Sequence, residues 1–203
     1  MYPSPIQNLI RAFSRFPTTG PRTATRFAFH CLGAPESEIN ELIENLKELK
    51  KSVKNCNICF RSVSKEDDLC SICKNKKRDH ETICIVEKET DLLSIENTKE
   101  YNGIYFILDG TVSPLKKEDF SSIRIKELKK RLKNHSDFDL PRIKEVIIAT
   151  NQNTEGDATA TYIARVLDEL RIKNTRLGRG LSTGSELEYA DDETLSSALK
   201  GRG

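Results

Sequence analysis

The chain of 203 residues contains no unbroken apolar run near the length of a membrane span or of a signal-peptide core. This absence argues against an integral membrane protein and against a secreted one. Cys31 lies on an apolar helical stripe and Cys84 in an apolar strand pattern, the usual settings of small buried hydrophobes. A reduced interior follows, and the sequence predicts a cytoplasmic protein.

A phosphate-binding loop is also missing, because no glycine-rich segment ends in Lys-Ser or Lys-Thr. The sequence therefore does not predict an ATPase. Near the C-terminus, a flexible basic loop is indicated by Arg176, Gly178, Arg179, Gly180 and Gly184. By itself this loop is weak evidence for phosphate binding.

Acidic residues are absent before Glu36, whereas the same segment contains Arg11, Arg15, Arg22 and Arg26. The net charge of the whole chain is only +2, so this local excess is more informative than the total. It suits a polyanion, although a solvated basic face would look the same. A mitochondrial transit peptide also has this composition, but the segment is patterned like folded structure.

Two helices around a tight turn are predicted in this basic segment. Apolar stripes at helical spacing are formed by Ile6, Leu9, Ile10, Phe13 and Phe16, and then by Ala24, Phe27, Ala28, Cys31 and Leu32. Pro17 and Gly20 break the first helix, and Pro21 suits the opening of the second. Backbone amides at such an opening hold a phosphate well, and Arg22 and Arg26 add charge one turn apart. A third, structural helix is predicted over about residues 37–53.

Four cysteines form two Cys-x-x-Cys pairs, Cys56 with Cys59 and Cys70 with Cys73, separated by ten residues. Each pair can offer two thiolates to one ion, so the spacing predicts a zinc site closed by four sulfur ligands. No position is left for water or substrate, and the metal is expected to be structural. Two disulfides or four unrelated thiols are the alternatives.

Strands alternate with helices after this site. Short, β-branched apolar segments at 82–86, 103–108 and 145–150 are typical of strands buried on both faces. Helical faces that could cover them are supplied by Leu92 and Ile95, by Ile125, Leu128 and Leu132, and by Ala160, Ile163, Leu167 and Leu170. The sequence thus predicts an α/β domain with a mostly parallel sheet.

Acids cluster where the strands should end: Glu87 directly follows the first strand, and Glu155 and Asp157 come just after the third, as the next helix opens. Carboxylates meeting at strand ends could hold magnesium, with Glu87 moving protons. Glu155 and Asp157 are equally explained by helix capping and the helix dipole. The residues alone leave both explanations open.

Taken in order, these pieces resemble the RecR family of bacterial recombination mediators along nearly the whole chain. The matching segments are residues 16–24 (FPTTGPRTA), Cys56 to Cys73 followed by Arg78-Asp79, 83–87 (ICIVE), 149–151 (ATN) leading to 155–160 (EGDATA), and 179–181 (RGL) leading to 187–191 (LEYAD). Thr18 stands where the family hairpin usually has glycine, and Asp109-Gly110 where the family often has two glycines.

The resemblance implies a domain order. It assigns residues 1–53 to a helix-hairpin-helix DNA-binding region, 54–80 to a four-cysteine zinc finger, 81–175 to a Toprim domain and 176–203 to a C-terminal segment. The role implied for this last segment is an intersubunit contact or nucleotide sensing. DNA contacts are expected at Gly20, Arg22 and Arg26, with Arg11 and Arg15 beside them. DNA would be gripped through its backbone, without base reading.

The resemblance also implies a function in recombinational DNA repair. Family members form ring-like oligomers, work with RecO and RecF, and help to load the RecA recombinase onto gapped DNA coated with single-strand-binding protein. They are not known as enzymes, so Glu87, Glu155 and Asp157 are expected to serve partner docking, or to be an inherited magnesium site without turnover. Ring-like dimers or tetramers of this chain are expected.

Two other classes of protein compete with this interpretation. A magnesium-dependent Toprim nuclease or primase-like enzyme is the first, although the nucleophilic tyrosine domain of topoisomerases and the larger catalytic chain of primases do not fit this sequence. A zinc-ribbon adaptor without a nucleic-acid role is the second. Arg22 and Arg26 beside the hairpin disfavour it.

Overall fold

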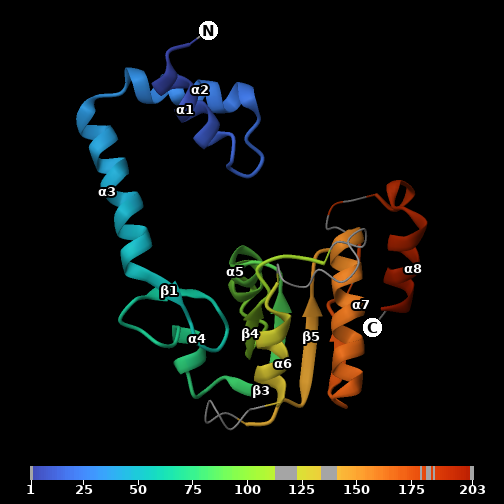
Figure 1. Cartoon of the computed structure of the whole chain (residues 1–203). Coiled ribbons are helices and arrows are strands. Elements are labelled where there is room, and N and C mark those ends of the chain that lie inside the picture. The colour runs from blue at the N-terminus through green and yellow to red at the C-terminus, as the bar shows by residue number, and fades with distance from the viewer. Residues whose placement is uncertain are drawn as a thin grey trace. The chain divides into compact units, whose positions relative to one another are not determined.

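The computed structural model describes residues 2–112, 123–133, 141–178, 180, 181, 184 and 186–201. The chain divides into an N-terminal unit that ends at Val53 and a larger unit that begins at Lys54 (Figure 1). In the described residues, no helix is both long enough and apolar enough to cross a membrane.

The N-terminal unit consists of helices α1 (Ser4–Phe13), α2 (Pro21–Gly33) and α3 (Glu36–Ser52). Ala24 and Ala28 are buried on α2, and their small side chains let α1 and α2 approach closely. The predicted helical stripe was wrong at Phe16, because α1 already ends at Phe13. The residue before a proline avoids helical geometry, and Phe16 precedes Pro17. Its ring instead packs edge to face on Phe13, with ring centres 5.8 Å apart.

The larger unit opens with a small module around the cysteines. Strands β1 (Val53–Asn55) and β2 (Ser62–Ser64) form a two-stranded sheet, and α4 (Ser71–Lys74) follows.

The sheet that follows is parallel and has the strand order β4-β3-β5-β6. Its strands are β3 (Asp79–Val86), β4 (Gly103–Ile107), β5 (Glu145–Ala149) and β6 (Lys173–Arg176). The first three are the predicted strands and their apolar side chains are largely buried, which confirms the α/β class. The fourth, of sequence KNTR, was not predicted.

Helices cover both faces of this sheet (Figure 1). On one face, α6 (Ile125–Lys133) and α7 (Thr154–Glu169) bury Leu128 and Ile163 against Ile85 and Phe106. On the other face, α5 (Glu89–Thr98) and the cysteine module pack against Cys84 and Tyr105.

The two cysteines outside the cluster differ in burial. Cys84 is buried as expected, and burial raises the pKa of its thiol to about 12, whereas Cys31 is only half buried. A 3₁₀ turn (Leu187–Tyr189) and α8 (Asp192–Lys200) end the described chain.

Candidate metal centre and nucleic-acid interface

The four predicted cysteine ligands lie together. Cys56 and Cys59 occupy the turn after β1, Cys70 caps the N-terminus of α4, and Cys73 lies within α4. Their sulfur atoms all fall within 4.8 Å of one another, and the Sγ atoms of Cys59 and Cys70 are 3.5 Å apart. Two backbone amides point inward, from Cys70 to the sulfur of Cys56 (3.3 Å) and from Cys73 to the sulfur of Cys70 (3.4 Å).

This geometry fits a tetrahedral ion bound by four thiolates. A Zn–S bond of about 2.3 Å puts ligand sulfurs roughly 3.8 Å apart in a tetrahedron, close to the spacing of Cys59 and Cys70. All six cysteines are free and the cluster cysteines are at most 5% exposed, so neither disulfides nor scattered thiols describe the site. Hydrogen bonding between the two thiols lowers the pKa of Cys56 and raises the pKa of Cys59, so Cys56 is the thiolate and Cys59 the thiol of this pair when no metal is bound.

The cysteine module seals the edge of the parallel sheet. The edge strand β4 donates a hydrogen bond from the Ile107 amide to the carbonyl of Cys59 (3.0 Å). Phe60 adopts a left-handed backbone conformation (φ 66°). Its ring packs edge to face on the ring of Phe106, with ring centres 5.3 Å apart. The guanidinium carbon of Arg124 lies 4.8 Å from the centre of the Phe60 ring. Loss of a metal bound by the four cysteines would therefore disturb the edge of the larger unit as well as the module itself.

A second connection follows the last cysteine. Arg78 forms a bidentate ion pair with Glu96 on α5, with nitrogen–oxygen distances of 2.5 and 2.9 Å. It also donates to the carbonyls of Tyr101 (3.0 Å) and Gly103 (2.9 Å), and the Tyr105 hydroxyl donates to Glu96 (2.9 Å). The hydrogen bond from Arg78 lowers the pKa of Glu96. This network fixes the end of the module to α5 and β4.

In the N-terminal unit, the hairpin between α1 and α2 has the features of an anion site. Gly20 occupies the N-cap of α2 in an extended conformation and Pro21 opens the helix, with no side chain capping it. The first amide bonded within α2 is that of Ala24, which donates to the Gly20 carbonyl (3.0 Å), so the amides of Arg22 and Thr23 have no partner inside the helix. Thr18 adopts φ 59°, the left-handed conformation that a glycine would take at lower cost.

The four predicted DNA-contacting arginines are exposed around this hairpin. Arg22 and Arg26 lie on α2, Arg11 lies in the last turn of α1, and Arg15 follows α1. None of them forms an ion pair with a carboxylate in the described part of the chain. Their charge is thus available to an external anion.

The predicted acids of the strand ends do not come together as one ligand set. Glu87 is buried, and its carboxylate accepts hydrogen bonds from the amide (2.7 Å) and the side chain of Asn151. Gly156 permits this close approach, since a Cβ there would lie 2.0 Å from the Asn151 carbonyl oxygen and 3.0 Å from the Glu87 carboxylate. Glu155 instead accepts from Thr111 (3.0 Å), and Asp157 pairs with Arg176 (2.6 Å).

Asp109 is held in the same way. It pairs with Arg124 at 2.9 Å and adopts φ 64°. Among the described residues, the cysteines are the only group of three or more His, Cys, Asp and Glu side chains with ligand atoms close enough to share an ion.

The partners of these acids were missed by sequence reasoning. Asn151 lay inside a matching segment, but nothing in the pattern assigned it to Glu87. Arg176, predicted in a flexible loop, ends β6 and binds Asp157, so that prediction was wrong for this residue. Arg179 lies outside the described residues.

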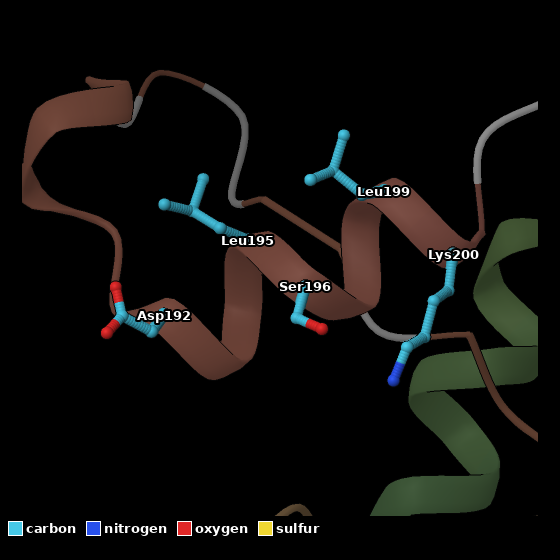
Figure 2. A pocket seen from close by; sticks show the side chains of 5 residues that line it. All are labelled: Asp192, Leu195, Ser196, Leu199 and Lys200. Atoms are coloured by element: carbon cyan, nitrogen blue, oxygen red, sulfur yellow. The ribbon is translucent and has the colours of Figure 1, made fainter.

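The C-terminal segment carries an open pocket of about 800 Å³ along α8 (Figure 2). It is lined by Asp192, Leu195, Ser196, Leu199 and Lys200, and Leu195 and Leu199 project from the same side of the helix. Leu199 and the nearby Leu187 are more than 60% exposed.

Comparison with known proteins covers all of these parts. Family models match residues 6–50 (RecR, helix-hairpin-helix), 81–178 (Toprim domain) and 180–202 (RecR, C-terminal). Proteins named recombination protein RecR from Cutibacterium acnes, Lactococcus lactis subsp. cremoris and Bifidobacterium animalis subsp. lactis are each 43% identical to this chain. The alignments span 99–100% of this chain and 96–98% of these relatives.

These names describe recombination proteins, in agreement with the family that the sequence motifs resemble. The alignment with the Cutibacterium acnes protein, over 202 residues, includes the hairpin, the cysteine module, the Toprim domain and the C-terminal segment. The chain belongs to the RecR family of recombination proteins.

Proposed function

We propose that this RecR-family chain is a DNA-binding recombination mediator in DNA repair, and that it grips the DNA backbone through the hairpin between α1 and α2. The observation that carries the proposal is the uncapped start of α2, with Arg22 and Arg26 exposed beside it. The positive end of the helix dipole and two amides without helical partners attract a phosphate, and the arginines add charge. Such contacts are to the backbone and carry no base information.

Arg11 and Arg15 enlarge the same basic surface. The sequence contains no acidic residue before Glu36, so no nearby acid along the chain offsets their charge. Each phosphate that they neutralise releases condensed cations, so the affinity falls steeply with added salt. The left-handed Thr18 supplies the turn that brings Gly20 and the start of α2 to the surface. We place Gly20 in the contact because the backbone can approach a phosphate closely where no side chain stands.

The metal of the cysteine cluster is proposed to be zinc in a structural role. Cys56, Cys59, Cys70 and Cys73 would hold it through four thiolates, with no ligand position open to substrate. Bound zinc neutralises charge among the crowded thiolates. The chain's own contribution is to hold the Cys59 carbonyl and the Phe60 ring against β4.

The carboxylates at the strand ends are proposed to serve partner docking and not magnesium chemistry. Glu155 and Asp157 reach the surface and would meet the partner, whereas the buried Glu87 would hold the Asn151 loop in place behind them. Glu87, Glu155, Asp157 and Asp109 are each engaged by side chains of this chain, and a magnesium ion would have to displace those contacts. We assign RecO and RecF as the docking partners and the loading of RecA at gapped single-stranded DNA as the outcome. These assignments follow from family membership, and so does the cytoplasm as the location.

Self-association is proposed as well. Helix α3 buries no residue, and it leaves four leucine and isoleucine side chains of its apolar stripe 42–56% exposed: Leu42, Ile43, Leu46 and Leu49. An exposed apolar stripe of this length is expected to be buried against another protein surface. A second copy of the chain, in a ring-like dimer or tetramer, is the partner that the family suggests.

The hairpin is tested by electrophoretic mobility shift on a gapped duplex with Arg22→Ala/Arg26→Ala protein. We expect weaker binding to every sequence and a salt dependence shallower by roughly one to two units of slope per subunit. Lys50→Ala/Lys51→Ala is the matched control, because it removes the same charge from exposed positions in the same unit. Equal binding by the arginine variant and the control would reject the hairpin as the grip.

The same electrophoresis experiment can distinguish a mediator from a nuclease. With magnesium added and one strand end-labelled, we expect the labelled strand to stay intact. Strand scission by wild-type protein that disappears in a Glu87→Gln variant would favour the Toprim enzyme instead, because such chemistry needs a metal-binding carboxylate.

A further inference from the structure

Helix α6 presents a basic surface that the proposed function does not use. Four lysines of the helix, here called the α6 lysine face, are Lys126, Lys129, Lys130 and Lys133. At 100° per residue they fall within an arc of roughly 100° on one side of the helix. Three of them are exposed and Lys129 is half buried.

The opposite side of α6 is buried, so the lysines must face outward. Ile125, Leu128 and Leu132 pack into the core of the larger unit and are at most 6% exposed. Lys126 and Lys133 are about 10.5 Å apart along the helix axis at 1.5 Å per residue. With one phosphate per roughly 3.4 Å along a nucleic-acid strand, that length spans about three phosphates.

Among the described residues, no carboxylate pairs with the lysines of this face. Glu127 at the flank is the single acid of α6. Arg142 extends the positive surface beyond the end of the helix. It lines a pocket of about 350 Å³ together with Lys133, Leu132, Leu170 and Ile172.

An aromatic ring lies beside the lysines. Tyr162 on α7 is half exposed, and the ammonium group of Lys129 lies 5.7 Å from its ring centre. Partly exposed aromatic rings next to cations are typical of surfaces on which nucleic-acid bases stack.

A nucleic-acid backbone explains this face better than an acidic protein does. Protein interfaces concentrate their binding energy in apolar and aromatic anchors at the centre of the contact. The exposed side of α6 has no apolar residue, because all of its leucine and isoleucine side chains are in the core. A row of exposed lysines with no apolar residue of its own, and with the Tyr162 ring beside it for a base to stack on, matches a nucleic-acid strand and its repeating phosphate charge.

We propose that the α6 lysine face and Arg142 form a second phosphodiester-binding surface, separate from the hairpin. The two surfaces belong to different compact units of the chain.

The test is a salt titration of oligonucleotide binding, single-stranded and duplex, by Lys126→Ala/Lys130→Ala/Lys133→Ala protein. Each lost phosphate contact should reduce the slope of log K against log salt by about 0.7–0.9, and the loss of two or three should raise Kd on the order of tenfold at moderate salt. The matched control is Lys65→Ala/Lys76→Ala/Lys77→Ala, which removes three exposed charges elsewhere in the same unit. A slope equal to that of the control overturns the proposal.

Lysine acetylation of the wild-type protein provides a readout that does not depend on the variant folding. Bound oligonucleotide should protect Lys126, Lys130 and Lys133 several-fold more than Lys65, Lys76 and Lys77. Polyglutamate, used as an acidic peptide probe, should not protect them. Protection by polyglutamate but not by DNA would assign the face to an acidic protein and refute the inference. The Arg22→Ala/Arg26→Ala protein, titrated in parallel, reports on the hairpin independently.

Discussion

The ion pair between Arg78 and Glu96 offers a quantitative test of how the cysteine module is held. Glu96→Gln removes the charge of the carboxylate but keeps its shape and one acceptor oxygen. Breaking a buried pair costs about 3–5 kcal/mol, whereas exposed pairs contribute about 0.2–1 kcal/mol. With side-chain exposures of 11% for Arg78 and 30% for Glu96, the pair lies between these limits. We expect Glu96→Gln to lower the free energy of unfolding by about 2 kcal/mol at pH 7.

The pH dependence of this difference is specific. The hydrogen bond from Arg78, supported by that from Tyr105, lowers the pKa of Glu96 below its ordinary value of 4.5. A carboxyl with a lowered pKa in the folded state stabilises that state above the unfolded pKa and loses this effect as the pH falls through the folded pKa. The gap between wild type and Glu96→Gln should therefore be constant from pH 7 to about pH 5 and shrink below about pH 4.5.

Urea denaturation followed by circular dichroism at one protein concentration measures this gap without screening the ion pair by salt. Glu100→Gln is the control, because it removes the same charge from an exposed acid just beyond α5. Any loss of metal in acid affects both proteins and cancels in the difference. A gap below about 0.5 kcal/mol at pH 7, or a gap unchanged in acid, would refute the reasoning.

Three further predictions concern the metal, the hairpin and the oligomer. Freshly purified, reduced protein should carry about one zinc per chain, and Cys70→Ser or a chelator should lower its stability because a structural metal contributes folding free energy; elemental analysis without zinc contradicts this. Thr18→Gly should raise the stability of the N-terminal unit by about 0.5–1 kcal/mol, since relief of a left-handed threonine exceeds the entropic cost of glycine; a lower melting temperature would show that the turn is not strained. Light scattering should find more than one chain per particle, and Leu42→Glu/Leu46→Glu should reduce that number; a monomeric wild type removes α3 as an interface.

The parallel sheet could be predicted from the sequence where its strands are buried on both faces. β3, β4 and β5 have continuous apolar, β-branched sequences, and each was located to within a few residues. β6 has the sequence KNTR, with two exposed and two half-buried residues, so hydrophobicity gave no signal. Its place at the edge of the sheet, paired with β5 alone, explains why a polar strand is tolerated there.

The site was predictable as far as local spacing decides it. The two Cys-x-x-Cys pairs could be recognised as a metal site from the sequence, because a single turn of the chain brings the two thiols of each pair together. The partners of the charged groups are different. Arg78 and Glu96 are 18 residues apart and Glu87 and Asn151 are 64 apart, so their contacts follow from the packing of whole elements. Only the register of the sheet and the docking of α5 and α7 bring such groups together.

The distribution of paired and unpaired charge explains how a nearly neutral chain can bind a polyanion. The 33 basic and 31 acidic residues leave a net charge of only +2. Where a guanidinium touches a carboxylate, as between Arg124 and Asp109 or Arg176 and Asp157, the two fields cancel within a few ångströms. At the hairpin and along the α6 lysine face, the described cations have no such partner, and their field reaches outward to about the Debye length of 10 Å at 0.1 M salt. The affinity for DNA should accordingly follow ionic strength far more steeply than the net charge suggests, because unpaired surface charge and not the total sets the number of counterions released.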